Sequence, residues 1–340
     1  MNQTLRKSSG NARAFVAGEN AHEVREPYDI FDKDPVRKKQ ARDRVIKNYE
    51  HLMATVKDPG WRKIIQELAQ TVEGQQMLAN FPDNVEFNVT KELPDQTPKE
   101  ADAVYQNDKN RLSVRPNNYN HHKNTRSDPH ATLLHEGVHA GQDNLGYIVG
   151  KGFSMQEVAD NNYLIEADAK GQESKIKIMK QVFNTLKPSK DQIKRFMKEG
   201  PFYKDGPLDR KIEAELKQMK KLYEEAGEPF DEKAERAKLK ERTIGTDEYK
   251  EQEKFRTCLR EAGGRLEKAK GEYAKGVFTS HLAGDNTNWS RDYAMQAIGV
   301  ILYMKEKGEL KDAGNPKAQD AIYSAIGKKY GLTGEEVKAA

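Results

Sequence analysis

The chain has 340 residues, of which 33% are charged and 36% hydrophobic, and its formal net charge is only +4. This length allows a buried core, the mixed charges indicate exposed helices, and the small net charge gives no sign of nucleic-acid binding. The single cysteine, Cys258, excludes an intrachain disulfide and a cysteine-based metal cluster, so any metal site must use histidine and carboxylate ligands.

The N-terminal residues 1–34 are polar and aperiodic, and we expect a flexible tail there. They lack the apolar segment of a secretory signal peptide. Nowhere does the chain approach the roughly eighteen apolar residues of a transmembrane helix. We therefore expect a cytoplasmic protein, or one that is exported without a conventional signal peptide.

The chain before residue 120 is expected to contain two helices, a strand and a β-hairpin, in that order. Apolar residues at helical spacing indicate the helices, and alternation of apolar and polar residues indicates the first strand. Two short apolar segments around the turn 107–110 indicate the hairpin. The expected bounds are 35–56 and 61–79 for the helices, 85–89 for the first strand, and 103–106 and 111–115 for the hairpin strands.

The rest of the chain is expected to be helical. Asp128 followed by Pro129 is typical of a helix start, and this helix should end near Gly146. Residues 154–157 have the capping-box pattern and should begin a long helix. Charged helices follow Pro188. The predicted fold class is therefore α+β, mostly helical, with a small antiparallel sheet or hairpin that packs on the helix of residues 128–146.

Residues 135–139 read His-Glu-Gly-Val-His, which is the H-E-x-x-H pattern. Two residues four apart on a helix lie on the same face, so the imidazoles of His135 and His139 can reach one ion. Glu136 would lie beside that ion without binding it, where its carboxylate could accept a proton from a metal-activated water. The pattern predicts a zinc site, and it is rarely met by chance in a chain with eight histidines.

A zinc site of this kind needs a third protein ligand, which we expect on a following helix. Glu166 lies far enough beyond His139 for a loop and a returning helix, and its small neighbours Ala167 and Ala169 permit close packing. Asp168 is the main competitor. It projects about 200° away from Glu166 on an ideal helix, so both cannot easily bind the same ion. Asp168 could instead hold a ligand imidazole in place.

Residues 135–142, His-Glu-Gly-Val-His-Ala-Gly-Gln, and residues 166–169, Glu-Ala-Asp-Ala, resemble the gluzincin type of zinc peptidase. More narrowly, the chain is similar to a bacterial family of predicted metallopeptidases over about residues 70–187. The narrower resemblance also includes segments 74–78, 85–89 and 111–116 and Tyr105.

The resemblance implies that His135, His139 and Glu166 bind Zn²⁺ and that Glu136 is the catalytic base. We expect a zincin-like catalytic domain at 35–187, which includes the residues that carry the resemblance. Residues 188–340 would then form a charged helical subdomain that completes the cleft or binds a protein partner.

In such enzymes a sheet edge beside the active-site helix commonly holds the substrate as an added strand. The strand at 111–115 could do so here, or it could be plain scaffold. An oxyanion donor is also expected, and Tyr163, His281 and Tyr293 are candidates. For each of them, packing or surface hydrogen bonding is an alternative. The remaining histidines near the motif, His121, His122 and His130, are more typical of a solvated loop and helix start.

The predicted function is that of a zinc metallopeptidase acting on a protein or peptide substrate. The main alternative is a helical interaction protein or secreted effector with a structural or degenerate zinc site. A zinc hydrolase for a non-peptide bond is a third reading, because the motif specifies water activation and leaves the scissile bond open.

Overall fold

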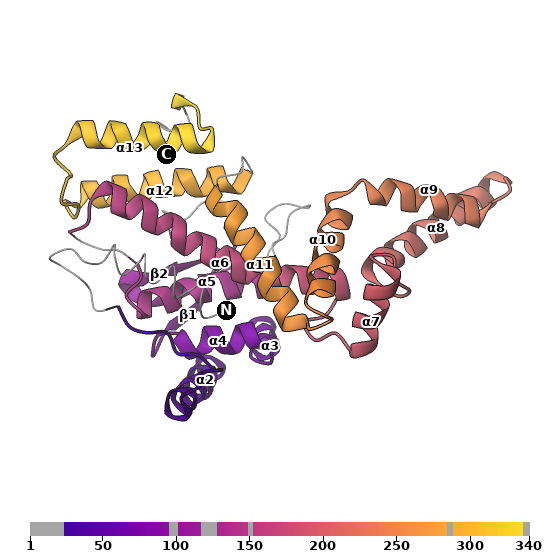
Figure 1. Ribbon diagram of the computed structural model, residues 1–340, viewed down its shortest axis with the longest axis horizontal. Helices are drawn as coiled ribbons and strands as arrows, with labels where there is room; N and C mark the ends of the chain where they lie inside the picture. The colour runs from indigo at the N-terminus through magenta and orange to yellow at the C-terminus, as the bar shows by residue number, and fades with distance from the viewer. Residues whose placement is uncertain (1–23, 95–100, 117–127, 149–151, 284–287, 336–340) are drawn as a thin grey trace. The chain divides into compact units, whose positions relative to one another are not determined.

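The computed structural model describes residues 24–94, 101–116, 128–148, 152–283 and 288–335 (Figure 1). These ranges form twelve α-helices and one three-stranded sheet. The prediction of a mostly helical α+β fold is confirmed. No helix in the described ranges is both long and apolar enough to cross a bilayer.

The chain divides into two compact units. Unit 1 comprises Met1–Glu173 and Val277–Ala340, and unit 2 comprises Ser174–Gly276. Two helices, α6 (Met155–Phe183) and α11 (Leu266–Ala283), contribute residues to both units. The predicted roles of residues 35–187 and 188–340 remain predictions.

Unit 1 begins with three helices, α2 (Pro35–Thr55), α3 (Pro59–Leu68) and α4 (Val72–Asn80). The single helix expected at 61–79 is therefore wrong, because the chain turns between α3 and α4. Thr71 caps α4: its hydroxyl accepts from the Gly74 amide and donates to the Leu68 carbonyl. A Cβ at Gly74 would lie 2.0 Å from the Leu68 oxygen, so this close turn requires glycine.

Polar side chains fix α4 on both sides. Asn48 of α2 donates to the Leu78 and Phe81 carbonyls at the end of α4, and Arg44 of the same helix also donates to the Phe81 carbonyl. The Asn80 side chain accepts from the Tyr28 amide and donates to the Tyr28 carbonyl. The described part of the N-terminal region is thereby held against α4.

The sheet has the strand order β1 (Glu86–Val89), β3 (Arg111–Val114), β2 (Ala103–Gln106). The predicted hairpin is present as the antiparallel pair β2–β3, but β1 pairs with β3 in parallel, so the sheet is mixed and not wholly antiparallel. Because β3 is central and pairs on both sides, the suggestion that this strand holds a substrate is wrong. The strand with an outer edge toward the motif helix is β2.

The motif helix is α5 (Pro129–Asn144), and the Asp128 side chain caps it as predicted. Gly137 and Gly141 face α4: a Cβ on Gly137 would lie 2.2 Å from Met77 Sδ, and one on Gly141 would lie 3.3 Å from Asn80 Cβ. The two glycines therefore let α4 lie close to one side of α5. Other sides of the helix face β2 and α6.

The N-terminal half of α6 packs on α12 (Asn288–Glu306) and α13 (Pro316–Tyr330) within unit 1 (Figure 1). The predicted capping box is present, since the Glu157 carboxylate accepts from the Ser154 amide and the Ser154 hydroxyl accepts from the Glu157 amide. An apolar cluster joins the three helices. Its buried members are Phe153, Met155, Val158, Ala159, Ile301, Met304, Leu310 and Ile322.

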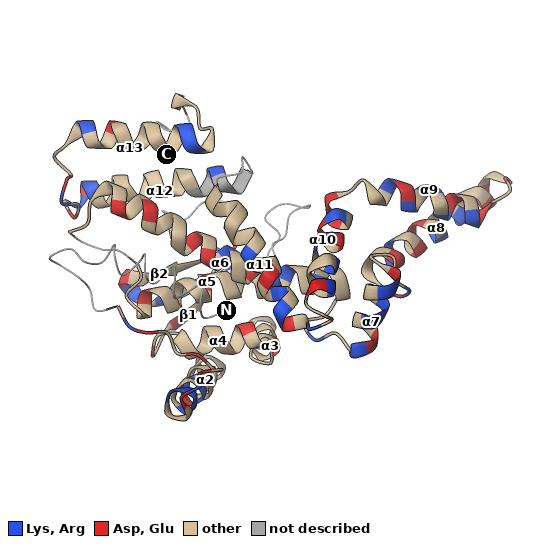
Figure 2. Cartoon of the chain, in the orientation of Figure 1, with Lys and Arg blue, Asp and Glu red and all other residues tan. Residues whose placement is uncertain are grey.

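Unit 2 contains the charged helices α7 (Lys190–Glu199), α8 (Pro207–Ala226), α9 (Glu232–Ile244) and α10 (Asp247–Glu261). Basic and acidic residues are interspersed along all four (Figure 2). Ion pairs such as Arg236 with Glu213 join α8 to α9. The apolar faces of these helices pack in small clusters, such as that of Ile212, Leu216 and Leu239. The charged residues lie on the opposite, exposed faces, which explains the mixed charge of the sequence.

Candidate metal centre

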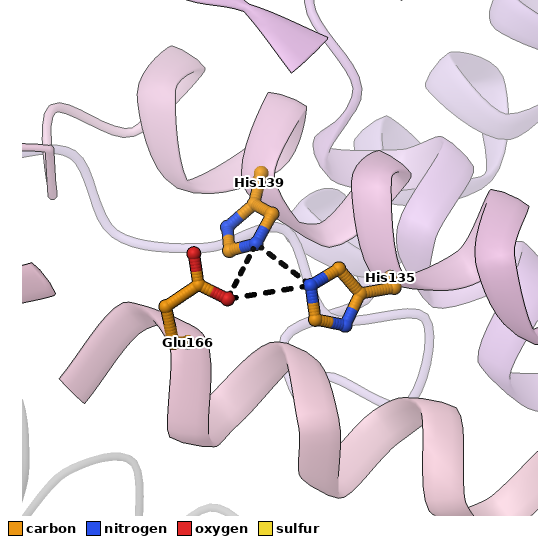
Figure 3. A group of neighbouring side chains, drawn as sticks. All are labelled: His135, His139 and Glu166. Atoms are coloured by element: carbon orange, nitrogen blue, oxygen red, sulfur yellow. Dashed lines mark hydrogen bonds and ion pairs between the residues drawn. The ribbon is translucent and has the colours of Figure 1, made fainter. Parts of the chain in front are cut away.

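His135 and His139 lie one turn apart on α5, and Glu166 reaches them from α6 (Figure 3). The Nε2 atoms of the two histidines are 3.1 Å apart. The Glu166 Oε2 atom lies 3.3 Å from each of them. All three side chains are buried. The structure thus brings together the three residues that the sequence predicts as ligands, and this group could hold a metal ion.

Hydrogen bonds on the far side of each imidazole set its tautomer. Glu173 Oε2 lies 3.0 Å from His135 Nδ1, and Gln142 Oε1 lies 2.9 Å from His139 Nδ1. A carboxylate and an amide oxygen only accept, so both Nδ1 atoms donate. When it is neutral, each ring then presents its Nε2 lone pair to the centre of the group.

Gln142 is itself held in one orientation. Its Nε2 donates to the Ile165 carbonyl at 3.0 Å and to Asp168 Oδ2 at 3.1 Å, so its oxygen must face His139. Asp168, the rival candidate for third ligand, therefore lies outside the group of three and orients His139 through Gln142. Such outer hydrogen bonds are a usual feature of protein metal sites.

The triangle of acceptor atoms has the size that a tetrahedral ion requires. Ligand atoms about 2.1 Å from a zinc ion at tetrahedral angles lie about 3.4 Å from one another. The observed separations are 3.1 and 3.3 Å. Three converging lone pairs repel one another unless a cation lies between them. Among the residues that the structure describes, no other group of three His, Cys, Asp or Glu side chains brings its ligand atoms this close together.

When no metal is bound, a proton can occupy the position between His135, His139 and Glu166 that a metal ion would take. Burial would lower the pKa of His135, but hydrogen bonds to Glu166 and Glu173 outweigh it and raise this pKa to about 10. Burial likewise opposes protonation of His139, and Glu166 raises its pKa. Burial would raise the pKa of Glu166, but the two imidazoles hold it well below its usual range. A metal ion must therefore displace a proton from this cluster.

We predict that the metal-free chain loses stability as the pH rises from about 6.5 toward 10. A pKa raised from 6.5 to about 10 on folding gives stability that is complete below 6.5 and is lost as the pH rises through the folded value. Bound zinc replaces the proton and should remove most of this loss. Thermal unfolding at several pH values, with chelator or with zinc, measures the difference. Equal pH dependence in the two states would contradict the prediction.

Glu136 lies on the side of α5 that faces the sheet, where its Oε2 accepts a 2.9 Å hydrogen bond from the Tyr105 amide of β2. The Tyr105 hydroxyl donates to Asp143 Oδ2 at 2.8 Å, two turns further along α5. Burial raises the pKa of the Tyr105 hydroxyl and also that of the Asp143 carboxyl. One residue of β2 thus contacts the helix beside the metal group through both its backbone and its side chain.

The other predicted site residues lie elsewhere. His121 and His122 lie outside the described residues. His130 is buried, and its Nε2 lies 2.6 Å from Glu67 of α3, so it joins two helices. It is not the solvated residue that we expected.

The candidate oxyanion donors Tyr163 and His281 are stacked on each other in the interior of unit 1, with ring centroids 4.9 Å apart. Tyr163 also packs with Tyr330. Tyr293 belongs to α12, but its side chain lies outside the described residues. The assignment of an oxyanion donor stays a prediction.

Three residues of this centre were given no role by the sequence. Glu173 follows Glu166 by seven residues, which places both on one face of α6, and this spacing could have indicated a second acid. Gln142 follows His139 by three residues and so shares its side of α5. Tyr105 belongs to the narrower family resemblance, but no role could be assigned to it, because its contact with α5 depends on how the hairpin packs.

No protein-family description, curated protein or solved structure matches this chain. The chemistry of the centre therefore rests on its own residues.

Proposed function

We propose that this chain is a zinc-dependent metallopeptidase. The observation that carries the proposal is the convergence of His135, His139 and Glu166, with Glu136 next to the first ligand and turned toward an edge strand. Two histidines and one carboxylate are a known donor set for catalytic zinc, and such a site leaves a fourth position for water. The two oriented imidazoles support zinc over calcium or magnesium, which prefer oxygen ligands.

Zinc, when bound, would lower the pKa of its water and polarise the carbonyl that is attacked. Glu136 would accept the proton of the attacking water and later pass it to the leaving amine, as a general base and then a general acid. Glu173 and Gln142 would hold the two imidazoles in the tautomer that leaves Nε2 free of protons. Asp168 would hold Gln142.

A peptide substrate is supported by the position of β2. In the antiparallel pair β2–β3, the Arg115 amide donates to the Asp102 carbonyl, so the backbone groups of Val104 and Gln106 face β3 and those of Ala103 and Tyr105 face outward. Ala103 is buried, so an extended peptide that adds to this edge would lie along the partly exposed residues of β2 next to Glu136. A substrate without a peptide backbone could not use this edge.

The wild-type protein provides the test. We expect about one zinc ion per chain after purification and cleavage of a mixture-based fluorogenic peptide library. A chelator should abolish the cleavage, and stoichiometric zinc should restore it. A folded protein that binds no zinc would contradict the metal site. A protein that binds zinc, cleaves no peptide and unfolds on chelation would instead support a structural zinc site in a helical interaction protein.

A further inference from the structure

We propose that Tyr105 is a positioning residue that holds the Glu136 carboxylate in place, and that the Tyr105–Asp143 hydrogen bond makes this possible. Two hydrogen bonds carry the inference. The Tyr105 amide donates to Glu136 Oε2 at 2.9 Å, and the Tyr105 hydroxyl donates to Asp143 Oδ2 at 2.8 Å. The inference rests on the proposed role of Glu136, but its main measurement does not require activity.

Both contacts of Tyr105 are made to the same helix, α5. Glu136 and Asp143 are seven residues apart, so they lie on one side of α5 and two turns apart along it. Tyr105 spans this distance with its backbone at one end and its hydroxyl at the other. The hydroxyl also lies 3.2 Å from Asn110 Oδ1, in the turn that joins β2 to β3. The hairpin is therefore fixed to the helix at the residue whose amide holds Glu136.

An outward-facing amide on an edge strand would otherwise be open to water or to a peptide. Here the Tyr105 amide points away from β3 and is paired with a carboxylate. A peptide added to this edge could therefore not pair with the Tyr105 amide. The bond leaves Glu136 with one oxygen tied to the strand and the other for the attacking water.

Hydrogen exchange at single amides tests the proposal, because Val104 and Gln106 are internal controls that pair with β3. In the Tyr105→Phe variant, exchange at residue 105 should accelerate about fivefold or more, while exchange at 104 and 106 stays unchanged. Asp143→Asn keeps an acceptor oxygen for the hydroxyl and should preserve protection, whereas Asp143→Ala should not. Glu136→Ala should remove protection at residue 105, and Glu136→Gln should keep it.

Kinetic measurements distinguish a positioning role of Tyr105 from a general loss of structure in the variant. Tyr105→Phe should lower kcat for a library-derived peptide by about tenfold to a hundredfold, since small displacements of a catalytic group have effects of this size. KM and zinc content should stay within about twofold. Tyr303→Phe, at a tyrosine that is 42% exposed, is the matched control.

Two results would overturn the proposal: unchanged exchange at residue 105 in Tyr105→Phe, or equal acceleration at 104, 105 and 106. The variants could show the expected exchange pattern while the wild-type protein cleaves no peptide. That result would support the positioning of Glu136 by Tyr105 and count against the proposed function.

Discussion

Replacing Glu136 by glutamine should lower peptide hydrolysis by about 10²- to 10⁴-fold, the usual contribution of a general base. Glutamine has nearly the same shape, and its side-chain oxygen can still accept from the Tyr105 amide. It cannot take a proton from water at neutral pH. Zinc content and thermal stability should therefore stay close to wild type while kcat falls.

The measurement compares kcat, bound zinc and the melting temperature in Glu136→Gln and in the wild type. Glu86→Gln is the matched control, because Glu86 is a solvent-exposed acid of the same unit whose ion pair with Arg111 contributes little. A Glu136→Gln enzyme that cleaves peptides at the wild-type rate would rule out Glu136 as the base. A variant that loses zinc as well would show that Glu136 has a structural role.

The parts of the centre that the sequence could predict are those set by a single helix. The spacing of His135 and His139 places both imidazoles on one face whatever else the chain does. The start of α5 follows from Asp128 and Pro129, and the start of α6 from the capping box at Ser154 and Glu157. These signals are local, and the structure contains all of them.

The remaining features depend on how elements pack, which local patterns do not encode. The turn between α3 and α4 interrupts a helical pattern that continues on both sides, and it forms because Thr71 caps the second helix. Whether Glu166 or Asp168 meets the histidines depends on the rotation of α6 about its own axis. The choice of β2 as edge strand depends on the parallel pairing of β1 with β3, which brings together residues distant in sequence.

Packing also explains why residues 137 and 141 are glycines. The side of α5 opposite the histidines lies against α4, where a Cβ on Gly137 would overlap Met77. The H-E-x-x-H pattern leaves this position open, since the metal chemistry does not depend on it. A larger residue at 137 would require the Met77 side chain to move, so the neighbouring helix favours glycine there.

Of the acidic residues around the metal centre, Glu166 is the one whose replacement by alanine should lower zinc affinity most. Glu166 is 5% exposed, and its carboxylate is the only anionic group among the three converging side chains. Its removal leaves two neutral imidazoles, so zinc affinity should fall by more than the roughly 10- to 100-fold that is typical of outer residues. Peptide hydrolysis should disappear with the metal.

A graded series makes this assignment decisive. Glu173→Ala removes the acceptor for His135 Nδ1, and Asp168→Ala removes one of the two acceptors that orient Gln142. Both should weaken zinc binding by about 10- to 100-fold at most, measured by competition with a chromophoric chelator. Asp168→Asn keeps an acceptor oxygen and should bind zinc almost as tightly as wild type. If Asp168→Ala lost zinc while Glu166→Ala kept it, Asp168 would be the third ligand, and α6 would have to turn about its axis to present it.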